Sequence, residues 1–481
     1  MNKRTILTAL VVTPLAFGMG ACGDDTDDTS GSGNATTSSG DGDMTGDGDM
    51  TGDGDMTGDG DGDGDQCADP LTTNPDDIVT VSGEIDGGAN WTCDKVYVLE
   101  NVVTVLGGEL SIEAGTTVRG QNGSALIIDK TATISASGTE NAPIVITADT
   151  TATSPTTVSR GDWGGLVLIG TAPANCGTAC TAEGFAANAP SYGGDDPTHN
   201  CGTLEYVRVE YAGFEVTAGN ELNGITFYGC GSDTTVSYVQ SHMGSDDGIE
   251  MFGGNFDADH IVVTGAADDS IDMDLGFTGD IQFLLVHHDD APQGDNGFEV
   301  SNGGDFAATP RTYPRFANAT VVGAGTGDKS TGIYLKEQTN FAIWNSVIGN
   351  FALDGNSVPK MLIVENDETC TEWNDGNIAI DFNIAIGGAE FVPTDASNPG
   401  TCDIAGLIGT NNLTDDADFS GLSLDPTWGS PNIQPDPASA AVNNGAGTAL
   451  PAEFEQTTYI GAVDPLAADD WTQAAWLNFS P

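Results

Sequence analysis

The chain has 481 residues and a formal net charge of -60, because 72 Asp and Glu stand against 12 Lys and Arg. Residues 22–65 hold 14 of the acids, so the chain from residue 66 onward is itself acidic, with 58 acids and 10 bases. A field of this sign repels phosphate backbones and anionic headgroups, which excludes nucleic acid as a partner and favours cations.

Residues 1–21 have the pattern of an export signal peptide. Lys3 and Arg4 precede an apolar run that a proline interrupts and that ends in small residues, and this run is too short for a stable membrane span. Met19-Gly-Ala-Cys22 resembles the lipobox of bacterial lipoproteins. We therefore predict a lipid anchor on Cys22 and a location at the cell envelope, at the outer membrane or cell surface. An ordinary signal peptide is the alternative.

Residues 22–65 are of low complexity and consist mainly of Gly, Asp, Ser and Thr. Three copies of Met-Thr-Gly-Asp-Gly-Asp begin at Met44, Met50 and Met56. Such a segment has almost no apolar surface to bury. We expect it to be a disordered tether that leads to one folded domain, residues 66–481.

From residue 66 onward the sequence predicts strands. Short β-branched runs alternate with Gly, Asn, Asp, Ser and Thr. Successive runs begin at Leu110, Leu126, Ile144 and Leu166, at intervals of 16, 18 and 20 residues. The blades of a β-propeller need about 40 residues each, so this spacing favours an all-β coil whose rungs stack in parallel.

Residues 204–349 are the most regular stretch, because two phrases alternate there. The first is an apolar strand, at residues 205–211, 236–242, 260–264, 281–286, 316–322 and 341–347. The second is a small, an apolar, a polar and an apolar residue, at residues 224–227, 248–251, 270–273, 297–300 and 332–335. Their recurrence predicts successive rungs of a parallel β-helix.

Acidic residues recur with the second phrase, and they are the candidate metal ligands: Asp246, Asp247, Glu250, Asp268, Asp269, Asp272, Asp295 and Glu299. Equivalent residues in neighbouring rungs lie about 4.8 Å apart. Two carboxylates at that distance repel by about 3.5 kcal/mol at an effective dielectric constant near 20. Within each phrase the acid points away from its apolar neighbours, which places it on the outside. We predict at least one structural calcium ion here, and a solvated acidic face is the alternative.

Eight cysteines remain after Cys22, and an even number in an exported chain indicates disulfides. Pairs that are close in sequence are the simplest expectation: Cys67 with Cys93, Cys176 with Cys180, Cys201 with Cys230, and Cys370 with Cys402. The segment 171–202 is expected to be a loop pinned by such bonds. Zinc bound by Cys176, Cys180 and Cys201 is the alternative.

An enzymatic function has weaker support in the sequence. Residues 245–250 resemble the paired-aspartate strand of polygalacturonase-type hydrolases, but the Gly-His-Gly turn and the Arg-Ile-Lys strand of that family are absent. A lyase would need a base such as Arg208 or Lys336. Four histidines lie in the acidic region, where a metal or acid-base role competes with a surface or turn position: His242, His260, His287 and His288.

After residue 349 the pattern becomes irregular, which predicts a loop-rich C-terminal cap over about residues 350–481. The last clear strands are residues 361–364 and 378–386. An open β-helix end exposes unpaired backbone and apolar interior. We therefore expect Trp471, Trp476 and Phe479 to plug that end rather than to bind sugar.

Several longer phrases are shared with a known family: Asn90–Leu99, Leu110–Arg119, Gly161–Gly170, Gly202–Gly213 and Asp470–Phe479. With them the chain resembles secreted bacterial lipoproteins with a right-handed parallel β-helix, over roughly residues 85–480. The resemblance implies fold and export and assigns no catalytic residue. We predict a monomeric surface lipoprotein with a calcium-stabilised β-helix, which has a binding, adhesion or display role towards a glycan or surface-protein ligand. A glycoside hydrolase or lyase is the alternative.

Overall fold

The computed structural model describes residues 67–151, 158–177, 180–185, 189–217, 220–289, 296–324, 331–351, 361–386, 412, 450–464, 466–467 and 470–480. The predicted signal peptide, the lipidation site Cys22 and the tether lie outside these residues. Residues Asp63–Pro481 form one compact unit. Among the described residues, no helix has the length and apolar character needed to cross a bilayer.

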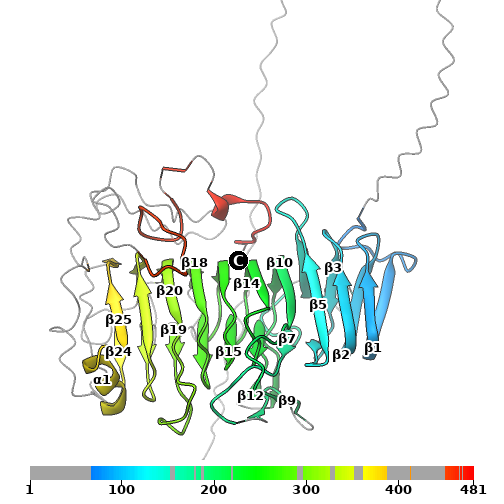
Figure 1. The fold of residues 1–481 in the computed structure, drawn as a ribbon. Coiled ribbons are helices and arrows are strands. Elements are labelled where there is room, and N and C mark those ends of the chain that lie inside the picture. Colours follow the sequence, from blue (N-terminus) through cyan, green and yellow to red (C-terminus); the bar gives the residue numbers. More distant parts are fainter. Residues whose placement is uncertain are drawn as a thin grey trace, which may run out of the picture. The chain divides into compact units, whose positions relative to one another are not determined.

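The described residues form a parallel β-helix, in which strands of successive turns pair side by side (Figure 1). Its first half contains β1 (Ile78–Trp91), β2 (Val96–Ile112), β3 (Thr117–Gly120), β4 (Ala125–Ile128), β5 (Ala132–Ser137), β6 (Ile144–Ala148), β7 (Leu166–Ile169), β10 (Gly202–Glu210), β13 (Ile225–Tyr228) and β14 (Thr235–His242). Its second half contains β15 (Ile249–Phe252), β16 (Ala258–Thr264), β17 (Ile271–Asp274), β18 (Asp280–His287), β19 (Asn296–Val300), β20 (Arg315–Val322), β21 (Thr331–Leu335), β22 (Phe341–Trp344), β23 (Val347–Gly349), β24 (Leu362–Val364), β25 (Ile378–Asp381) and β26 (Ile384–Ile386).

Among the described residues, four short strands and two short helices lie outside this sheet. The strands form the antiparallel pairs β8 (Cys180–Thr181) with β9 (Ser191–Tyr192), and β11 (Glu215–Thr217) with β12 (Asn220–Glu221). The helices are α1 (Asp367–Asn374) and the 3-10 turn η2 (Trp471–Gln473). Tyr192 belongs to β9, and Leu222 directly follows β12. Both pack against the outward rings of Tyr228 and Phe252. They cover part of the outer face of β13 and β15.

The register confirms the rungs predicted between residues 204 and 349. Strands β10, β14, β16, β18 and β20 pair in that order, and β13, β15, β17, β19 and β21 do the same. A Cβ at Gly248 would lie 2.3 Å from Val263 Cγ1, so close packing requires the small residue that opens the phrase. The runs that begin at Leu110, Leu126, Ile144 and Leu166 are not successive rungs, as their spacing had suggested: Leu110 lies opposite Ile134, whereas Leu126 lies opposite Leu166.

The strands β10, β14, β16, β18 and β20 each bend at a residue with positive φ. In β14 this residue is Tyr238, at φ 54°, and it separates the inward residues Val236 and Val239. The equivalent bends are Tyr206, His260, Phe283 and Asn318. The left-handed conformation turns the chain by one corner, so inward residues on the two sides of the bend are three apart instead of two.

Inward side chains of neighbouring rungs stack into one core. Phe298, Phe316 and Phe341 are fully buried, and the ring centroids of Phe298 and Phe316 lie 4.7 Å apart. Burying such a side chain stabilises the fold by about 1.5–3 kcal/mol. Because a rung cannot bury these residues alone, the stability of the coil comes from stacking.

Disulfides join three of the predicted pairs: Cys67 with Cys93, Cys176 with Cys180, and Cys201 with Cys230. The zinc alternative was therefore wrong, because all three of its cysteines are oxidised. Cys370 is also disulfide-bonded, and its expected partner Cys402 lies outside the described residues.

The aromatic residues of the C-terminus do not plug the end of the β-helix, so that prediction was wrong. Trp476 is fully buried against Val262, Leu285 and Val322, which point outward from β16, β18 and β20. Figure 1 shows the C-terminal segment, in red, along these strands. The segment is also tied down by hydrogen bonds: Gln240 Nε2 donates to the carbonyl of Asn478, whose backbone N–H donates to Gln240 Oε1. The apolar outward residues of the sheet provide the surface that it covers.

Candidate metal centre

The acidic residues form a continuous outward row on β15, β17 and β19. The register places Glu250 opposite Asp272, and Asp272 opposite Glu299. In β15 the flanking residues Ile249 and Met251 point into the core, so Glu250 points outward. We call Asp246, Asp247, Glu250, Asp268, Asp269, Asp272 and Glu299 the acidic ladder. Asp295, the eighth predicted ligand, lies outside the described residues.

The ladder brings its carboxylates together in three groups. They are Asp246 with Asp247 and Asp268, Asp247 with Glu250 and Asp272, and Asp269 with Asp272 and Glu299. Within each group, one oxygen of each residue lies within 4.8 Å of the others. The first and third groups share no residue, so the geometry allows two ions at the same time.

Hydrogen bonds between rungs hold the ladder in place. Asp247 Oδ1 accepts the backbone N–H of Asp269 at 2.9 Å, and Asp269 Oδ1 accepts that of Asn296 at 2.7 Å. Each of these residues directly precedes the small residue of its phrase. An acid therefore recurs at this position because its carboxylate accepts a hydrogen bond from a backbone N–H of the next rung. The same hydrogen bond holds the carboxylate in one orientation, in which its other oxygen can bind a ligand.

The ladder is less exposed than expected. Asp247, Glu250 and Asp269 are 7%, 5% and 5% exposed, because neighbouring rungs and the covering segments surround them. Burial, followed by the charge of neighbouring carboxylates, raises the pKa of Asp247, Glu250 and Asp272 well above the ordinary range. Burial together with Asp268 raises the pKa of Asp246 to about 7. The interpretation of the ladder as a merely solvated face was therefore wrong for its buried members.

Local positive charge offsets little of this repulsion. Lys336 Nζ forms an ion pair with Glu299 at one end of the ladder. Glu183 adds a further carboxyl beside Glu250, and partial desolvation followed by the charge of Asp274 raises its pKa. Among the described residues, one lysine does not balance seven clustered carboxylates, so the folded site favours either protonation or a bound cation.

Two buried oxygens beside these carboxylates lack a hydrogen-bond donor among the described residues. Asp272 Oδ1 and Asn223 Oδ1 are buried and have no hydrogen-bond partner among the described residues. Asn223 is 3% exposed, and its Nδ2 donates to Glu250 Oε2, so its amide lies beside the second group. A buried acceptor without a donor is unusual and costly. Carboxylate and amide oxygens are the ligands that hard cations take, and calcium accepts six to eight of them in irregular geometry.

Asn223 was missed by the sequence analysis, although a signal for it exists. It stands directly before Gly224, as Asp247 stands before Gly248 and Asn296 before Gly297. The position before the small residue of every phrase is thus polar. Asp274, opposite Phe252 in the next outward row, was missed as well, and burial raises its pKa.

The residues considered for catalysis are mostly buried or engaged. His242 and His287 lie two rungs apart, because both are paired with Thr264, and they are 1% and 0% exposed. His288 is 3% exposed and contacts Ser270 Oγ at 2.8 Å, and burial lowers its pKa to about 4. Arg208 forms an ion pair with Glu210 at 2.5 Å, and its Nη1 donates to the Trp476 carbonyl. These contacts favour structural roles.

Without a bound cation, the protein is expected to lose stability as the pH rises from about 4 to about 7. In this interval the folded ladder retains protons that the unfolded chain has released, because the pKa values of Asp246, Asp247 and Glu250 are raised. The free energy of unfolding then falls by about 1.4 kcal/mol per pH unit for each such carboxyl. The buried His242 and His288, whose pKa burial lowers to about 4, have the opposite effect and offset part of this fall. Urea unfolding in chelator at pH 4 to 7 measures this slope, and calcium should reduce it. A slope that is flat in chelator contradicts the assignment.

Residues 83–422 match the model described as "Pectate-lyase like beta helix domain", which covers most of the chain. No curated protein and no solved structure matches the chain.

Proposed function

The chain belongs to the family of pectate-lyase-like β-helix domains, and we propose that it is an exported surface protein that binds a ligand on a calcium-stabilised scaffold. The observation that supports calcium is the acidic ladder, with three groups of oxygens within 4.8 Å and two buried oxygens that lack hydrogen-bond partners in the part of the chain that the structure describes. In this proposal calcium bridges neighbouring rungs and replaces the protons that the buried carboxyls would otherwise keep.

The proposed location is the bacterial cell envelope, with Cys22 as the lipid anchor and residues 22–65 as a tether. Disulfides such as Cys201–Cys230 support export, because such bonds persist in oxidising compartments. The test is growth with labelled palmitate. We expect label in the full chain and none in the Cys22→Ser variant, whereas equal label in both would contradict the anchor.

The fold family makes polysaccharide cleavage the second candidate. Against it, the aspartates of the ladder recur in consecutive rungs and bond to the backbone, as the Asp247–Asp269 contact illustrates. A catalytic pair would instead occur in one rung and not recur in its neighbours. His242 is also only 1% exposed, and the guanidinium of Arg208 is already paired with Glu210.

Binding and cleavage are separated by one experiment. The calcium-loaded protein is incubated with insoluble and soluble polysaccharides, both neutral and acidic, and the bound protein and newly formed reducing ends are measured together. We expect retention on at least one polysaccharide without new ends. Calcium-dependent release of new ends would overturn the binding function in favour of the enzyme.

A further inference from the structure

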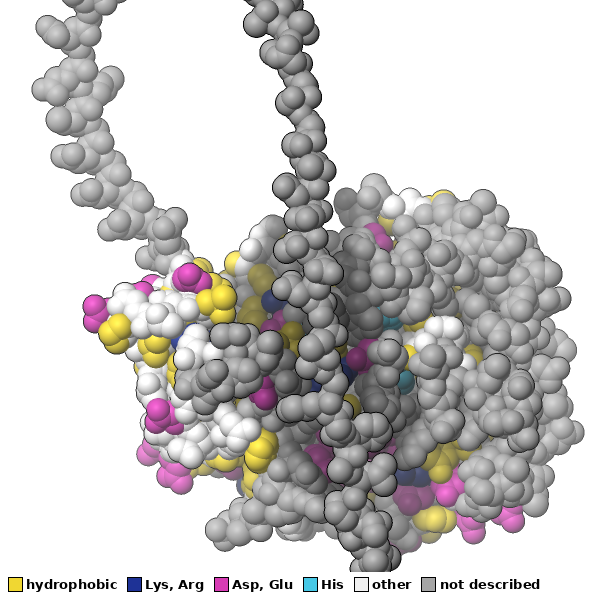
Figure 2. All heavy atoms as spheres, turned by 180° about the vertical axis from the view of Figure 1, so that it is seen from behind, with side chains coloured by type: hydrophobic (Ala, Val, Ile, Leu, Met, Phe, Trp, Pro, Cys, Tyr) yellow, Lys and Arg dark blue, Asp and Glu magenta, His cyan; other side chains and the backbone are white. Residues whose placement is uncertain are grey.

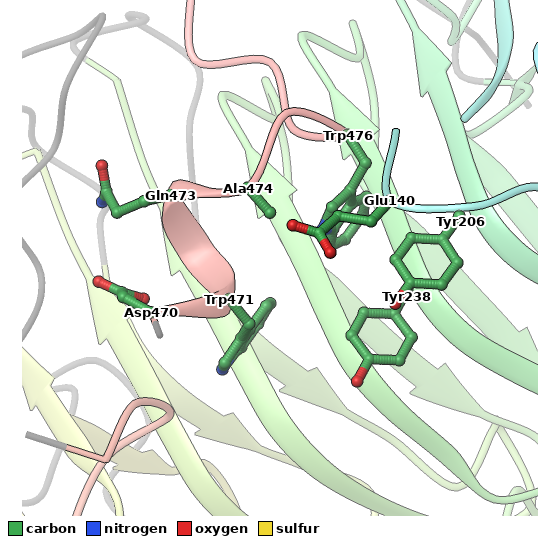
Figure 3. A pocket seen from close by; sticks show the side chains of 8 residues that line it. All are labelled: Glu140, Tyr206, Tyr238, Asp470, Trp471, Gln473, Ala474 and Trp476. Atoms are coloured by element: carbon green, nitrogen blue, oxygen red, sulfur yellow. The ribbon is translucent and has the colours of Figure 1, made fainter. Parts of the chain in front are cut away.

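A groove lies where the C-terminal segment crosses the bends of the β-helix. Its volume is about 530 Å³, within the usual range for ligand sites of roughly 300–1,000 Å³. It is lined by Glu140, Tyr206, Tyr238, Asp470, Trp471, Gln473, Ala474 and Trp476 (Figure 3). These residues come from the β5–β6 turn, from the bends of β10 and β14, and from the C-terminal segment, so three distant parts of the chain build it.

Aromatic rings form one wall of the groove in a fixed arrangement. Tyr206 and Tyr238 are stacked at 4.4 Å with an interplanar angle of 10°, and His260 continues the stack at 4.2 Å from Tyr238. Trp476 packs edge-on against both tyrosines, at 5.8 and 6.0 Å. Trp471 Nε1 donates to the Ala462 carbonyl at 3.0 Å, so its ring is also held in place. A ligand therefore meets rings that are already ordered, which lowers the entropic cost of binding.

The rim of the groove carries acceptors. Figure 3 shows the carboxylate of Glu140 directed towards the C-terminal segment, with Asp470 and Gln473 on the opposite side. Asp470 Oδ1 accepts from the backbone N–H and from Oγ1 of Thr472, which fixes this carboxylate at the start of η2. Such oxygens accept hydrogen bonds from hydroxyl groups.

The charge of the groove restricts its ligand. The eight lining residues include two carboxylates and no Lys, Arg or His. Acidic side chains also mark the described surface on the face seen in Figure 2. A uronate or sulfated sugar would be repelled. An aromatic wall with hydroxyl-accepting groups at its edge instead fits the apolar C–H face and the hydroxyl rim of an uncharged sugar ring.

We propose that this groove binds an uncharged hexose or pentose polysaccharide chain by stacking on Trp471 beside the ordered tyrosine stack, with Glu140, Asp470 and Gln473 accepting its hydroxyl groups. The inference rests on the binding function proposed above and names its ligand class and its site. It is independent of the acidic ladder, because the groove shares no residue with it.

Calorimetric titration with cellohexaose, xylohexaose, mannohexaose and hexagalacturonate tests the inference. At least one neutral hexasaccharide is expected to bind and to change Trp fluorescence, with no binding of hexagalacturonate. Trp471→Ala should weaken the binding of the neutral hexasaccharide about tenfold or more, because loss of one stacking partner costs at least about 1.4 kcal/mol. Trp471→Phe, which retains a ring, should weaken it less.

Two exposed residues allow a test that leaves the fold intact. Glu140→Ala and Gln473→Ala should each weaken binding several-fold, whereas Glu100→Ala, an exposed glutamate on β2, should not. Unchanged affinity in the Glu140, Gln473 and Trp471 variants, tighter binding of hexagalacturonate, or no binding of any neutral probe would overturn the inference. Cleavage of a bound probe would instead overturn the proposed binding function.

Discussion

Calcium is expected to raise the melting temperature of the chelator-treated protein by roughly 5 °C or more. Two groups of the ladder share no residue, so two ions can bind together. At calcium concentrations about 100-fold above the dissociation constant, each ion stabilises the folded state by about 2.7 kcal/mol. The effect is large because the ion both binds and removes repulsion among Asp247, Glu250 and Asp272.

An isosteric variant is expected to change stability in opposite directions in chelator and in calcium. Asp272→Asn removes one negative charge from two of the three groups. In chelator it should be at least as stable as the wild type, because less repulsion remains, whereas in calcium it should be less stable. Asp233→Asn, on an exposed turn outside the ladder, is the matched control and should respond to calcium as the wild type does. Equal melting temperatures with and without calcium in the wild type would contradict calcium stabilisation.

Replacing Trp476 by Ala is expected to cost about 3–5 kcal/mol of stability, as for other large aromatic residues in cores. The side chain is fully buried against Val262, Leu285 and Val322, and it packs edge-on against Tyr206. Its loss also frees the C-terminal segment from the sheet, so limited proteolysis should cut within residues 470–480 under conditions that leave the wild type intact.

Trp476→Phe is the control for this substitution, because it retains a ring and should recover part of the lost stability. Urea unfolding gives the free energies, and mass spectrometry locates the cleavage. If Trp476→Ala unfolds at the same urea concentration as the wild type, the C-terminal segment does not pack on these strands as described.

The rungs between residues 204 and 349 were predictable because both of their periodicities are local. In residues 248–251 the alternation of Ile249, Glu250 and Met251 fixes which side chains face the core. Equivalent phrases then fix the register, which is why Glu250, Asp272 and Glu299 line up as expected. The alignment of the ladder thus follows from the sequence, whereas its burial does not, because the covering segments come from elsewhere in the chain.

The bends and the C-terminal segment could not be placed from local periodicity. A bend such as Tyr238 interrupts the alternation, so a period of two fails within the strand. The stack of Tyr206, Tyr238 and His260 could have been found by noticing inward residues that are three apart. The signal for a cover on the outer face was the uninterrupted apolar run Ile261-Val-Val263, but nothing in the run identifies which segment covers it.

Calorimetric titration of calcium into the metal-free protein tests most directly the claim that the acidic ladder is a metal centre. The double variant Asp247→Asn with Asp272→Asn removes a carboxylate from every one of the three groups. We predict saturable calcium binding by the wild type and its loss in the double variant, with the β-helix still folded by circular dichroism. Calcium binding of equal affinity and stoichiometry in both proteins, or none in the wild type, would contradict the claim.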